Sequence, residues 1–96
     1  MQKIIKQFPN YTIYSEGYVV NHETGHQVTK RLIRGYNYVD LKYKSKRKNM
    51  RLGRLVAMTF IPNPKRLPQV NHKDSNCLND TLENLEWISC SGNMFH

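Results

Sequence analysis

The last third of the chain sets carboxamide and imidazole side chains between two short apolar runs, and no other stretch constrains the fold as strongly. Residues 70–95 read V-N-H-K-D-S-N-C-L-N-D-T-L-E-N-L-E-W-I-S-C-S-G-N-M-F. Residues 70–73 predict a short strand, residues 75–81 an Asn-rich turn, and residues 84–89 a second strand whose side chains alternate between two faces. A helix is expected to begin near Ser91. The stretch therefore predicts a hairpin followed by a helix.

Three polar side chains of this unit are expected to point at one spot, which can hold a metal ion and a phosphate. They are Asn71 and His72 on the first strand and Asn93 at the start of the helix. Cleaving a phosphodiester bond needs a base that takes a proton from water, and histidine side chains titrate near the working pH. The reaction also needs positive charge on the phosphate, which a hard cation such as Mg²⁺ supplies through oxygen ligands. Because two carboxamides alone hold Mg²⁺ weakly, we expect a phosphate of the substrate to complete its ligand shell.

The run V-N-H-K-D-S-N-x-L-N-D-x-L-E-N-L-E-W-I-S, followed by N-M, resembles the HNH endonuclease family, in its phage and intron-encoded branch of homing-type nucleases. The resemblance implies a ββα-metal finger in which His72 is the general base and Asn71 and Asn93 bind one divalent metal, Mg²⁺ or Mn²⁺. It also implies that Asn84 braces the loop and holds His72 in place. Many relatives have Asp at the position of Asn71, so this chain offers the metal a neutral oxygen where they offer a charged one.

A simpler interpretation exists for each part of this motif. A single histidine between Asn and Lys is usually a surface residue, and an Asn-rich turn is usually only a turn, because Asn tolerates left-handed backbone and caps locally. Short motifs in general deserve this caution. The ordered agreement along the whole run favours a site, since a turn has no need for Asn84 to precede L-E-W-I-S and then Asn93.

The charge balance points to a polyanionic partner, and we expect double-stranded DNA. The 96 residues include 15 basic and 7 acidic side chains, for a net charge of +8, and the sequence pI is about 9.7. A chain of this length predicts one small domain, or two subdomains that share a modest core. No segment has the length or apolar character of a membrane span or a signal peptide, so we expect a cytoplasmic protein, in the host cytoplasm for a phage gene.

The two cysteines, Cys77 and Cys90, suit free thiols in a reducing compartment. A zinc site made of both cysteines with His72 and His96 is an alternative. The spacing contains no Cys-x-x-Cys pair, which disfavours it.

Residues 8–30 predict a meander of short strands at residues 11–14, 18–21 and 26–29, separated by the turns S-E-G and N-H-E-T-G. This part resembles the small module that often precedes HNH domains in phage endonucleases. His22 and His26 lie in or beside a turn and are expected to face solvent.

Residues 34–54 predict a strand, a basic tip K-S-K-R-K and a return strand at residues 49–52, with Val39 and Leu41 on the face opposite Tyr38 and Asp40. Asp40 is the one acidic residue between positions 30 and 54. The tyrosines between the basic residues suit contact with phosphates and sugars. We expect the ten basic residues of this segment to bind DNA: Lys30, Arg31, Arg34, Lys42, Lys44, Lys46, Arg47, Lys48, Arg51 and Arg54.

Residues 51–61 predict the best helix of the chain, with an apolar stripe that Pro62 and Pro64 end. Relatives often carry V-H-R-L-V-A here, whereas this chain has L-G-R-L-V-A. Gly53 thus stands in place of a histidine, which removes a possible site residue or phosphate contact.

The fold prediction is α+β: a small antiparallel β region, then a helix, then a C-terminal ββα-metal finger. Residues 1–50 form the expected basic DNA-binding module, and residues 51–96 the helix and the HNH motif. Because only three residues follow Asn93, either a second copy of the chain completes the helix, or Asn93 is poorly held, or the product is a shortened relic. The predicted function is a metal-dependent DNA endonuclease. The alternatives are a DNA-binding module that has lost cleavage and a zinc-stabilised interaction domain.

Overall fold

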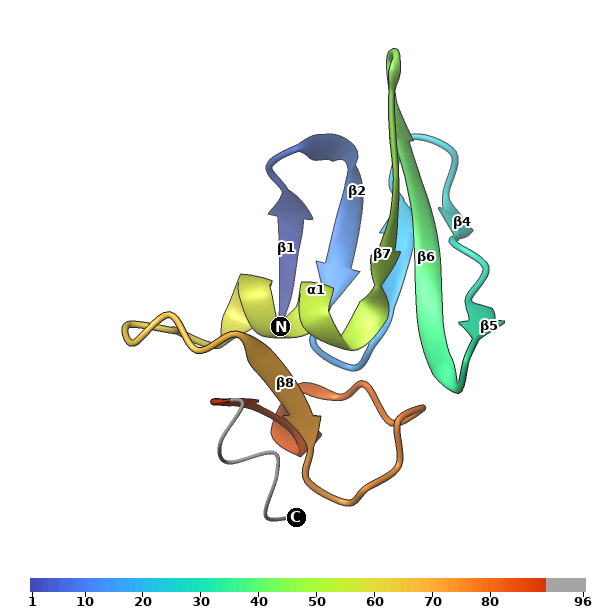
Figure 1. The fold of residues 1–96 in the computed structure, drawn as a ribbon. Coiled ribbons are helices and arrows are strands. Elements are labelled where there is room, and N and C mark those ends of the chain that lie inside the picture. The colour runs from blue at the N-terminus through green and yellow to red at the C-terminus, as the bar shows by residue number, and fades with distance from the viewer. Residues whose placement is uncertain (90–96) are drawn as a thin grey trace.

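The computed structural model describes residues 1–89. Within them, nine strands, one α-helix and one 3₁₀ turn follow one another along the chain (Figure 1). The elements in order are β1 (Gln2–Ile5), β2 (Phe8–Tyr14), β3 (Tyr18–Asn21), β4 (His26–Gln27), β5 (Arg31–Ile33), β6 (Tyr36–Tyr43), β7 (Lys46–Arg51), α1 (Leu52–Phe60), β8 (Gln69–His72), η1 (Leu82–Asn84) and β9 (Leu85–Ile88). The antiparallel strands and the helix confirm the α+β prediction.

Strands β1 to β4 form an antiparallel sheet in sequential order. Ile13 of β2 and Val19 of β3 are register partners, and both are fully buried. The predicted strand at residues 18–21 has the bounds of β3. β2 begins earlier than predicted, because Phe8 pairs with Ile5 and is itself buried. The last predicted strand of this region is shorter than expected and ends at Gln27.

Strands β5, β6 and β7 form a second antiparallel sheet whose long hairpin projects past the other strands (Figure 1). Val39 and Leu41 on one face of β6 are fully buried, and Tyr38 and Asp40 lie on the other face, as the alternation predicted. The predicted basic tip is narrower than expected. Tyr43 pairs with Lys46, so the turn consists of residues 44–45 alone, and the other basic residues of the tip lie on β7.

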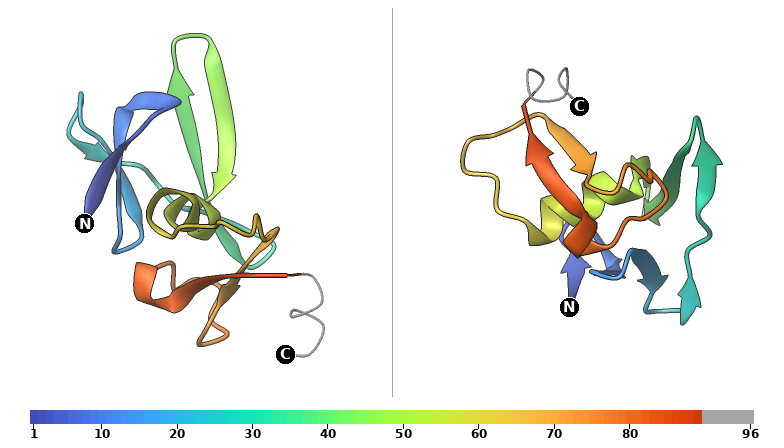
Figure 2. Two further views of the ribbon diagram at one scale, coloured as in Figure 1. Left: turned by 90° about the vertical axis from the view of Figure 1, so that its left-hand side faces the viewer. Right: turned by 90° about the horizontal axis from the view of Figure 1, so that it is seen from below.

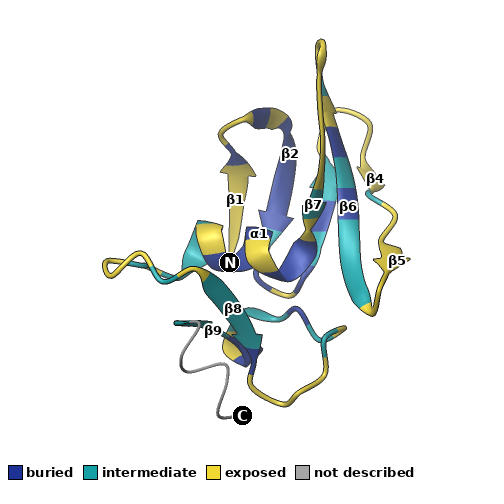
Figure 3. Cartoon of the chain, viewed as in Figure 1, coloured by how far each residue is buried: buried dark blue, intermediate teal, exposed yellow. Residues whose placement is uncertain are grey.

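Helix α1 lies between these two sheets and the β8–β9 pair (Figures 1 and 2). It is one residue shorter at each end than predicted and ends where the amide of Ile61 donates to the carbonyl of Ala57, just before Pro62. Its buried face, dark blue in Figure 3, joins a single core cluster with side chains from β1, β2, β3, β6 and β9. This cluster contains residues from both sides of position 50. The division into modules at that position stays a prediction.

The β8–β9 pair is antiparallel, and the loop between the two strands carries the Asn-rich turn. The predicted second strand at residues 84–89 is shorter than expected, because Leu82–Asn84 form a 3₁₀ turn in which the amide of Asn84 donates to the carbonyl of Thr81. Three predictions concern residues outside those described. They are the helix from Ser91, Asn93 as a metal ligand, and a second chain that completes this helix. No helix in residues 1–89 is long and apolar enough to cross a membrane.

Candidate active site

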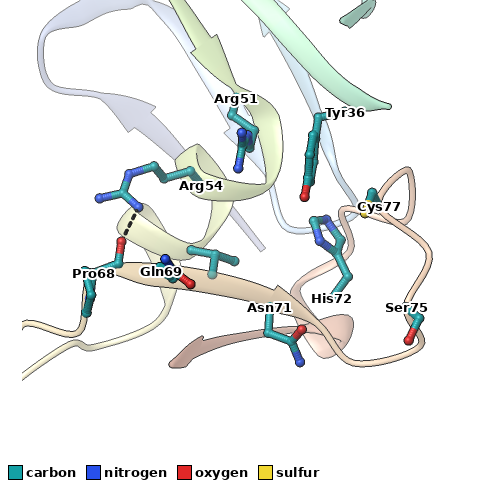
Figure 4. Close-up of a pocket in the computed structure, with 10 residues that line it drawn as sticks. Tyr36, Arg51, Arg54, Pro68, Gln69, Asn71, His72, Ser75 and Cys77 are labelled. Carbon is teal, nitrogen blue, oxygen red and sulfur yellow. Dashed lines mark hydrogen bonds between the residues drawn. The ribbon is translucent and has the colours of Figure 1, made fainter. Parts of the chain in front are cut away.

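A pocket of about 500 Å³ lies where β8, the start of α1 and the start of β6 meet (Figure 4). β8 places Asn71 and His72 in its wall, and the loop after β8 adds Ser75 and Cys77. The remaining lining residues come from the start of β6, the end of β7, α1, the residue before β8, and β8 itself: Tyr36, Arg51, Arg54, Pro68, Gln69 and Val70. The pocket thus combines an imidazole, a carboxamide and two guanidinium groups.

His72 ends β8 and is buried, with 7% of its surface exposed. Its ring atom Nε2 lies 2.8 Å from Oδ1 of Asp80, and the ring centroid lies 6.2 Å from that of Tyr36. The simpler interpretation of this histidine as a surface residue is therefore wrong. A buried imidazole with a polar partner on one nitrogen is held in one orientation, which a general base requires.

Asp80 is a site residue that the sequence did not reveal. It is 4% exposed, and besides His72 it accepts a hydrogen bond at Oδ2 from the side-chain amide of Asn37 at 3.1 Å. The same Asn37 amide donates to the carbonyl of Leu78 at 3.3 Å. Asn37 lies on β6, on the same face of that strand as Val39 and Leu41. The contact between Asn37 and Asp80 could not be predicted from sequence spacing, because the two residues are 43 positions apart.

Asn71 lies beside His72 and pairs across the two strands with Glu86. Its side-chain nitrogen donates to Oε2 of Glu86 at 2.8 Å, so the amide oxygen is the atom of this side chain that could bind a cation. A carboxamide oxygen suits a hard cation such as Mg²⁺. Residues 1–89 contain no cluster of three or more His, Cys, Asp or Glu side chains that could hold a metal. The second predicted ligand, Asn93, lies beyond them.

Asn84 is almost completely buried and braces the loop between β8 and β9. Its side-chain nitrogen donates to Oδ1 of Asp74 and to the carbonyl of Asn79, both at 2.9 Å, and its side-chain oxygen accepts from the amide of Asp74 at 3.0 Å. None of its side-chain hydrogen bonds within residues 1–89 reaches His72, which is held by Asp80. Hydrogen bonds from Asn79, from the amide of Asn76 and from Asn84 hold the pKa of Asp74 below its ordinary value of 3.8.

Arg51 and Tyr36 form the side of the pocket nearest the hairpin (Figure 4). The guanidinium of Arg51 lies 3.9 Å from the centroid of the Tyr36 ring, and it donates to the hydroxyl of Tyr38 at 3.4 Å. A side-chain hydrogen bond with Cys77, the electrostatic influence of Cys77 and burial raise the pKa of Tyr36 above 10.0. The phenol therefore stays protonated at neutral pH. Arg54 donates to the carbonyl of Pro68 at 2.9 Å and lies over Trp87.

The ten basic residues expected to bind DNA are all exposed, on β5 to β7, their turns and flanking segment, and the start of α1. Arg51 and Arg54 alone among them line the pocket, and the basic residues near the hairpin tip lie away from it. Arg31 forms an ion pair with Asp40 at 2.9 Å, so its charge is partly compensated. Hydrogen bonds from Asn49 and then from Arg31 lower the pKa of Asp40.

The remaining histidines and the alternative zinc ligands lie apart from this arrangement. His22 and His26 are exposed, as predicted, and His22 shares a hydrogen bond with Thr12 at 2.9 Å. Of the four residues of the alternative zinc site, His72 and Cys77 both line the pocket, but His72 is bound to Asp80 and Cys77 to Tyr36. Cys90 and His96 lie outside the described residues.

No family model matches this chain, but individual proteins do. Over 94 residues it is 37% identical to the uncharacterized HNH endonuclease L245 of Acanthamoeba polyphaga mimivirus, covering 98% of this chain and 28% of that protein. It is 34% identical over 86 residues to the H-N-H endonuclease F-TflII of Escherichia phage T5, covering 86% of this chain and 45% of the phage protein.

The fold is also found in a solved structure of the HNH homing endonuclease I-HmuI, a structure that concerns DNA binding and cleavage by that enzyme. The TM-score is 0.89 at 28% sequence identity, and the match covers 99% of this chain and 56% of that one. The chain thus spans about a quarter to a little over half of the proteins it matches. The motif around His72, the fold and these relatives agree, and the chain belongs to the HNH endonuclease family.

Proposed function

We propose that this chain carries the catalytic site of a divalent-metal-dependent endonuclease that hydrolyses phosphodiester bonds of double-stranded DNA. One observation carries the proposal: an oriented imidazole, a carboxamide oxygen and two guanidinium groups line one pocket below an exposed basic hairpin. The names of the relatives, and the cleavage reported for I-HmuI, support the same assignment.

In this proposal His72 is the general base. Its imidazole takes a proton from water, the resulting hydroxide attacks phosphorus, and the bond from phosphorus to one sugar oxygen breaks. The leaving oxygen takes a proton from solvent. Burial of the ring and its contact with Asp80 support the role, because a base must hold one orientation relative to the attacking water.

Asn71 and Asn93 are the proposed ligands of Mg²⁺ or Mn²⁺. The donor chemistry fits, because the contact of the Asn71 nitrogen with Glu86 leaves an oxygen for a hard cation. A bound cation of this kind supplies positive charge to the reacting phosphate. A neutral carboxamide oxygen binds such a cation weakly, which agrees with a ligand shell that a DNA phosphate completes.

Arg51 and Arg54 are proposed to hold the phosphate next to His72. A guanidinium group donates through a planar fork that matches phosphate oxygens. The ring of Tyr36 and the hydroxyl of Tyr38 keep the guanidinium of Arg51 in place at the pocket. The other eight basic residues, spread over β5 to β7 and their flanks, contact the DNA backbone farther along the duplex and add affinity without sequence preference.

A second candidate is a DNA-binding module that no longer cleaves efficiently. One observation favours it: the predicted metal ligand of β8 is neutral, and its nearest carboxylate, Glu86, is occupied by the Asn71 amide. Binding would then survive on the basic hairpin, while the pocket would hold a cation too weakly for turnover.

The deciding experiment incubates the 96-residue chain with supercoiled plasmid and Mg²⁺ or Mn²⁺, and measures DNA binding separately by fluorescence anisotropy. Wild type should convert plasmid to open-circular or linear DNA. His72→Ala should abolish this conversion and leave DNA affinity unchanged, whereas the matched control His22→Ala, at an exposed histidine, should behave as wild type. If wild type binds without cutting, the second candidate holds. If His72→Ala cuts at the wild-type rate, His72 is not the base.

A further inference from the structure

We infer that Asp80 is the positioning residue of His72: it accepts a hydrogen bond from Nε2–H and so fixes the tautomer that leaves the lone pair of Nδ1 free for water. The inference rests on the proposed function for its catalytic meaning, but its structural content stands without it. The two atoms lie 2.8 Å apart, and both side chains are almost completely buried. An ionised carboxylate only accepts hydrogen bonds, so the nitrogen that faces it must carry the proton.

Asp80 packs against two glycines, and a side chain at either of these positions would overlap with it. A Cβ on Gly17, in the turn between β2 and β3, would lie 2.9 Å from the Asp80 carbonyl oxygen. A Cβ on Gly53 of α1 would lie 2.6 Å from Oδ1 of Asp80. Real Cβ atoms do not approach other atoms so closely, so both positions require glycine as long as Asp80 stays in place. The absence of a side chain at Gly53 therefore makes room for the carboxylate.

Asn37 explains why the residue at position 80 must be a carboxylate. Its side-chain amide donates to the second oxygen of Asp80 at 3.1 Å, so two donors converge on one side chain. An asparagine at position 80 has the same shape, but only one of the two atoms that face His72 and Asn37 is then an acceptor oxygen, and the other is a donor nitrogen. Asn37 cannot turn its amide around without losing the bond from its nitrogen to the carbonyl of Leu78. The asparagine nitrogen would then face Nε2, and the ring would have to place its proton on Nδ1.

The consequence for catalysis follows from the tautomer. With the proton on Nε2, the lone pair of Nδ1 can accept a proton from water. The carboxylate then stabilises the positive imidazolium that forms, as an orienting aspartate does in other acid–base sites. With the proton on Nδ1, the ring presents a donor to the water and cannot act as its base.

The test uses the full chain in four forms: wild type, Asp80→Asn, Asn37→Ala and the double variant. The ¹⁵N chemical shifts of the ring nitrogens, recorded without metal or DNA, report the tautomer, and the His72→Gln spectrum identifies His72 among the four histidines. We expect Nε2–H in wild type and in Asn37→Ala, and Nδ1–H in Asp80→Asn. The double variant should return to Nε2–H, because removing the Asn37 donor frees the asparagine oxygen for His72.

Plasmid cleavage should follow the tautomer. Asp80→Asn should lower kcat roughly 10- to 100-fold with little change in KM, and the double variant should recover part of that loss. Wild-type Nδ1–H, or an Asp80→Asn variant that keeps both its tautomer and its kcat, overturns the inference. Should Asp80→Asn fail to fold, the wild-type spectrum alone still decides the tautomer. If wild type shows no cleavage, the proposed function fails, and the spectra still decide the contact.

Discussion

Gly53 in α1 lies directly against the carboxylate of Asp80: a Cβ at this position would be 2.6 Å from Oδ1 of Asp80 and 3.2 Å from Nε2 of His72. The helix backbone, the carboxylate and the imidazole thus pack together without room for a side chain. Any substitution here must push the Asp80–His72 pair apart or displace the helix.

Gly53→Ala should destabilise the protein, although alanine favours a helix over glycine by about 1 kcal/mol. The added methyl group has no space, and overpacking of a buried site costs roughly 1–3 kcal/mol. Chemical denaturation should show the loss, and plasmid cleavage should fall with it. Met58→Ala, at an exposed position of the same helix, serves as the control and should leave stability nearly unchanged. A Gly53→Ala variant more stable than wild type would contradict the close contact.

Asn84→Ala should lower stability by about 1–3 kcal/mol, because it removes a buried side chain that satisfies three partners of the loop. Cleavage should decline too, since the same loop carries Asp80. The comparison is Asn76→Ala, at an exposed residue whose side chain accepts one bond from the amide of Leu78. Lost activity at an unchanged melting temperature would point instead to a direct role of Asn84 in the reaction.

Acid should destabilise the fold through Asp74, whose pKa is below 3.8 in the folded chain chiefly because of the hydrogen bond from Asn79. A folded pKa below the unfolded one favours the native state above the unfolded pKa, and this stability is lost as pH falls through the folded pKa. The free energy of unfolding of wild type, measured with urea, should therefore fall as the pH drops below 3.8. Asp74→Asn should show a shallower loss there, with the part due to Asp40 remaining. Equal slopes for both proteins would mean that Asp74 titrates alike in the folded and unfolded states.

The basic hairpin should behave as an electrostatic clamp on DNA. Changing Lys44, Lys46, Arg47 and Lys48 to Gln should weaken binding alike for all sequences and flatten the dependence of log K on log salt by roughly 0.9 per lost phosphate contact. The control changes Lys65 and Arg66, which are exposed in the segment between α1 and β8. An unaltered slope for the hairpin variant would place the DNA elsewhere.

Asn71→Asp should raise metal affinity, because it gives the cation a charged ligand of the same size. The same change places a carboxylate against Glu86, which now accepts the amide of Asn71 at 2.8 Å. Without metal the variant should therefore melt below wild type, and Mg²⁺ or Mn²⁺ should raise its melting temperature more than that of wild type. Plasmid cleavage should reach half its maximum at lower Mg²⁺.

Glu86→Gln is the matched control for this prediction, since it keeps an acceptor for Asn71 and removes the charge. Combined with Asn71→Asp, it should abolish the instability without metal and retain part of the gain in metal affinity. Metal titrations of wild type and Asn71→Asp that superimpose would remove Asn71 from the metal site.

The sequence by itself determined the elements and the family, because both depend on local order along the chain. Alternation of Val39 and Leu41 with Tyr38 and Asp40 predicted β6, the apolar stripe ended by Pro62 predicted α1, and the run around His72 predicted the HNH family. Hairpin turns and the ends of strands were predicted less accurately. The pairing of Tyr43 with Lys46, for example, depends on a two-residue turn that the charge pattern hides.

Only the tertiary structure decided what surrounds His72. Asn37, Gly53 and Asp80 come from β6, α1 and the loop before β9, and no periodicity relates their positions. Folding brings them together because the core buries one face of each element, which fixes where the adjacent polar side chains point. A buried carboxyl then needs donors within reach, since an unpartnered polar group costs free energy in the interior. His72 and Asn37 are the hydrogen-bond partners of the buried Asp80 carboxylate, and the bond to Asp80 holds the imidazole at the pocket.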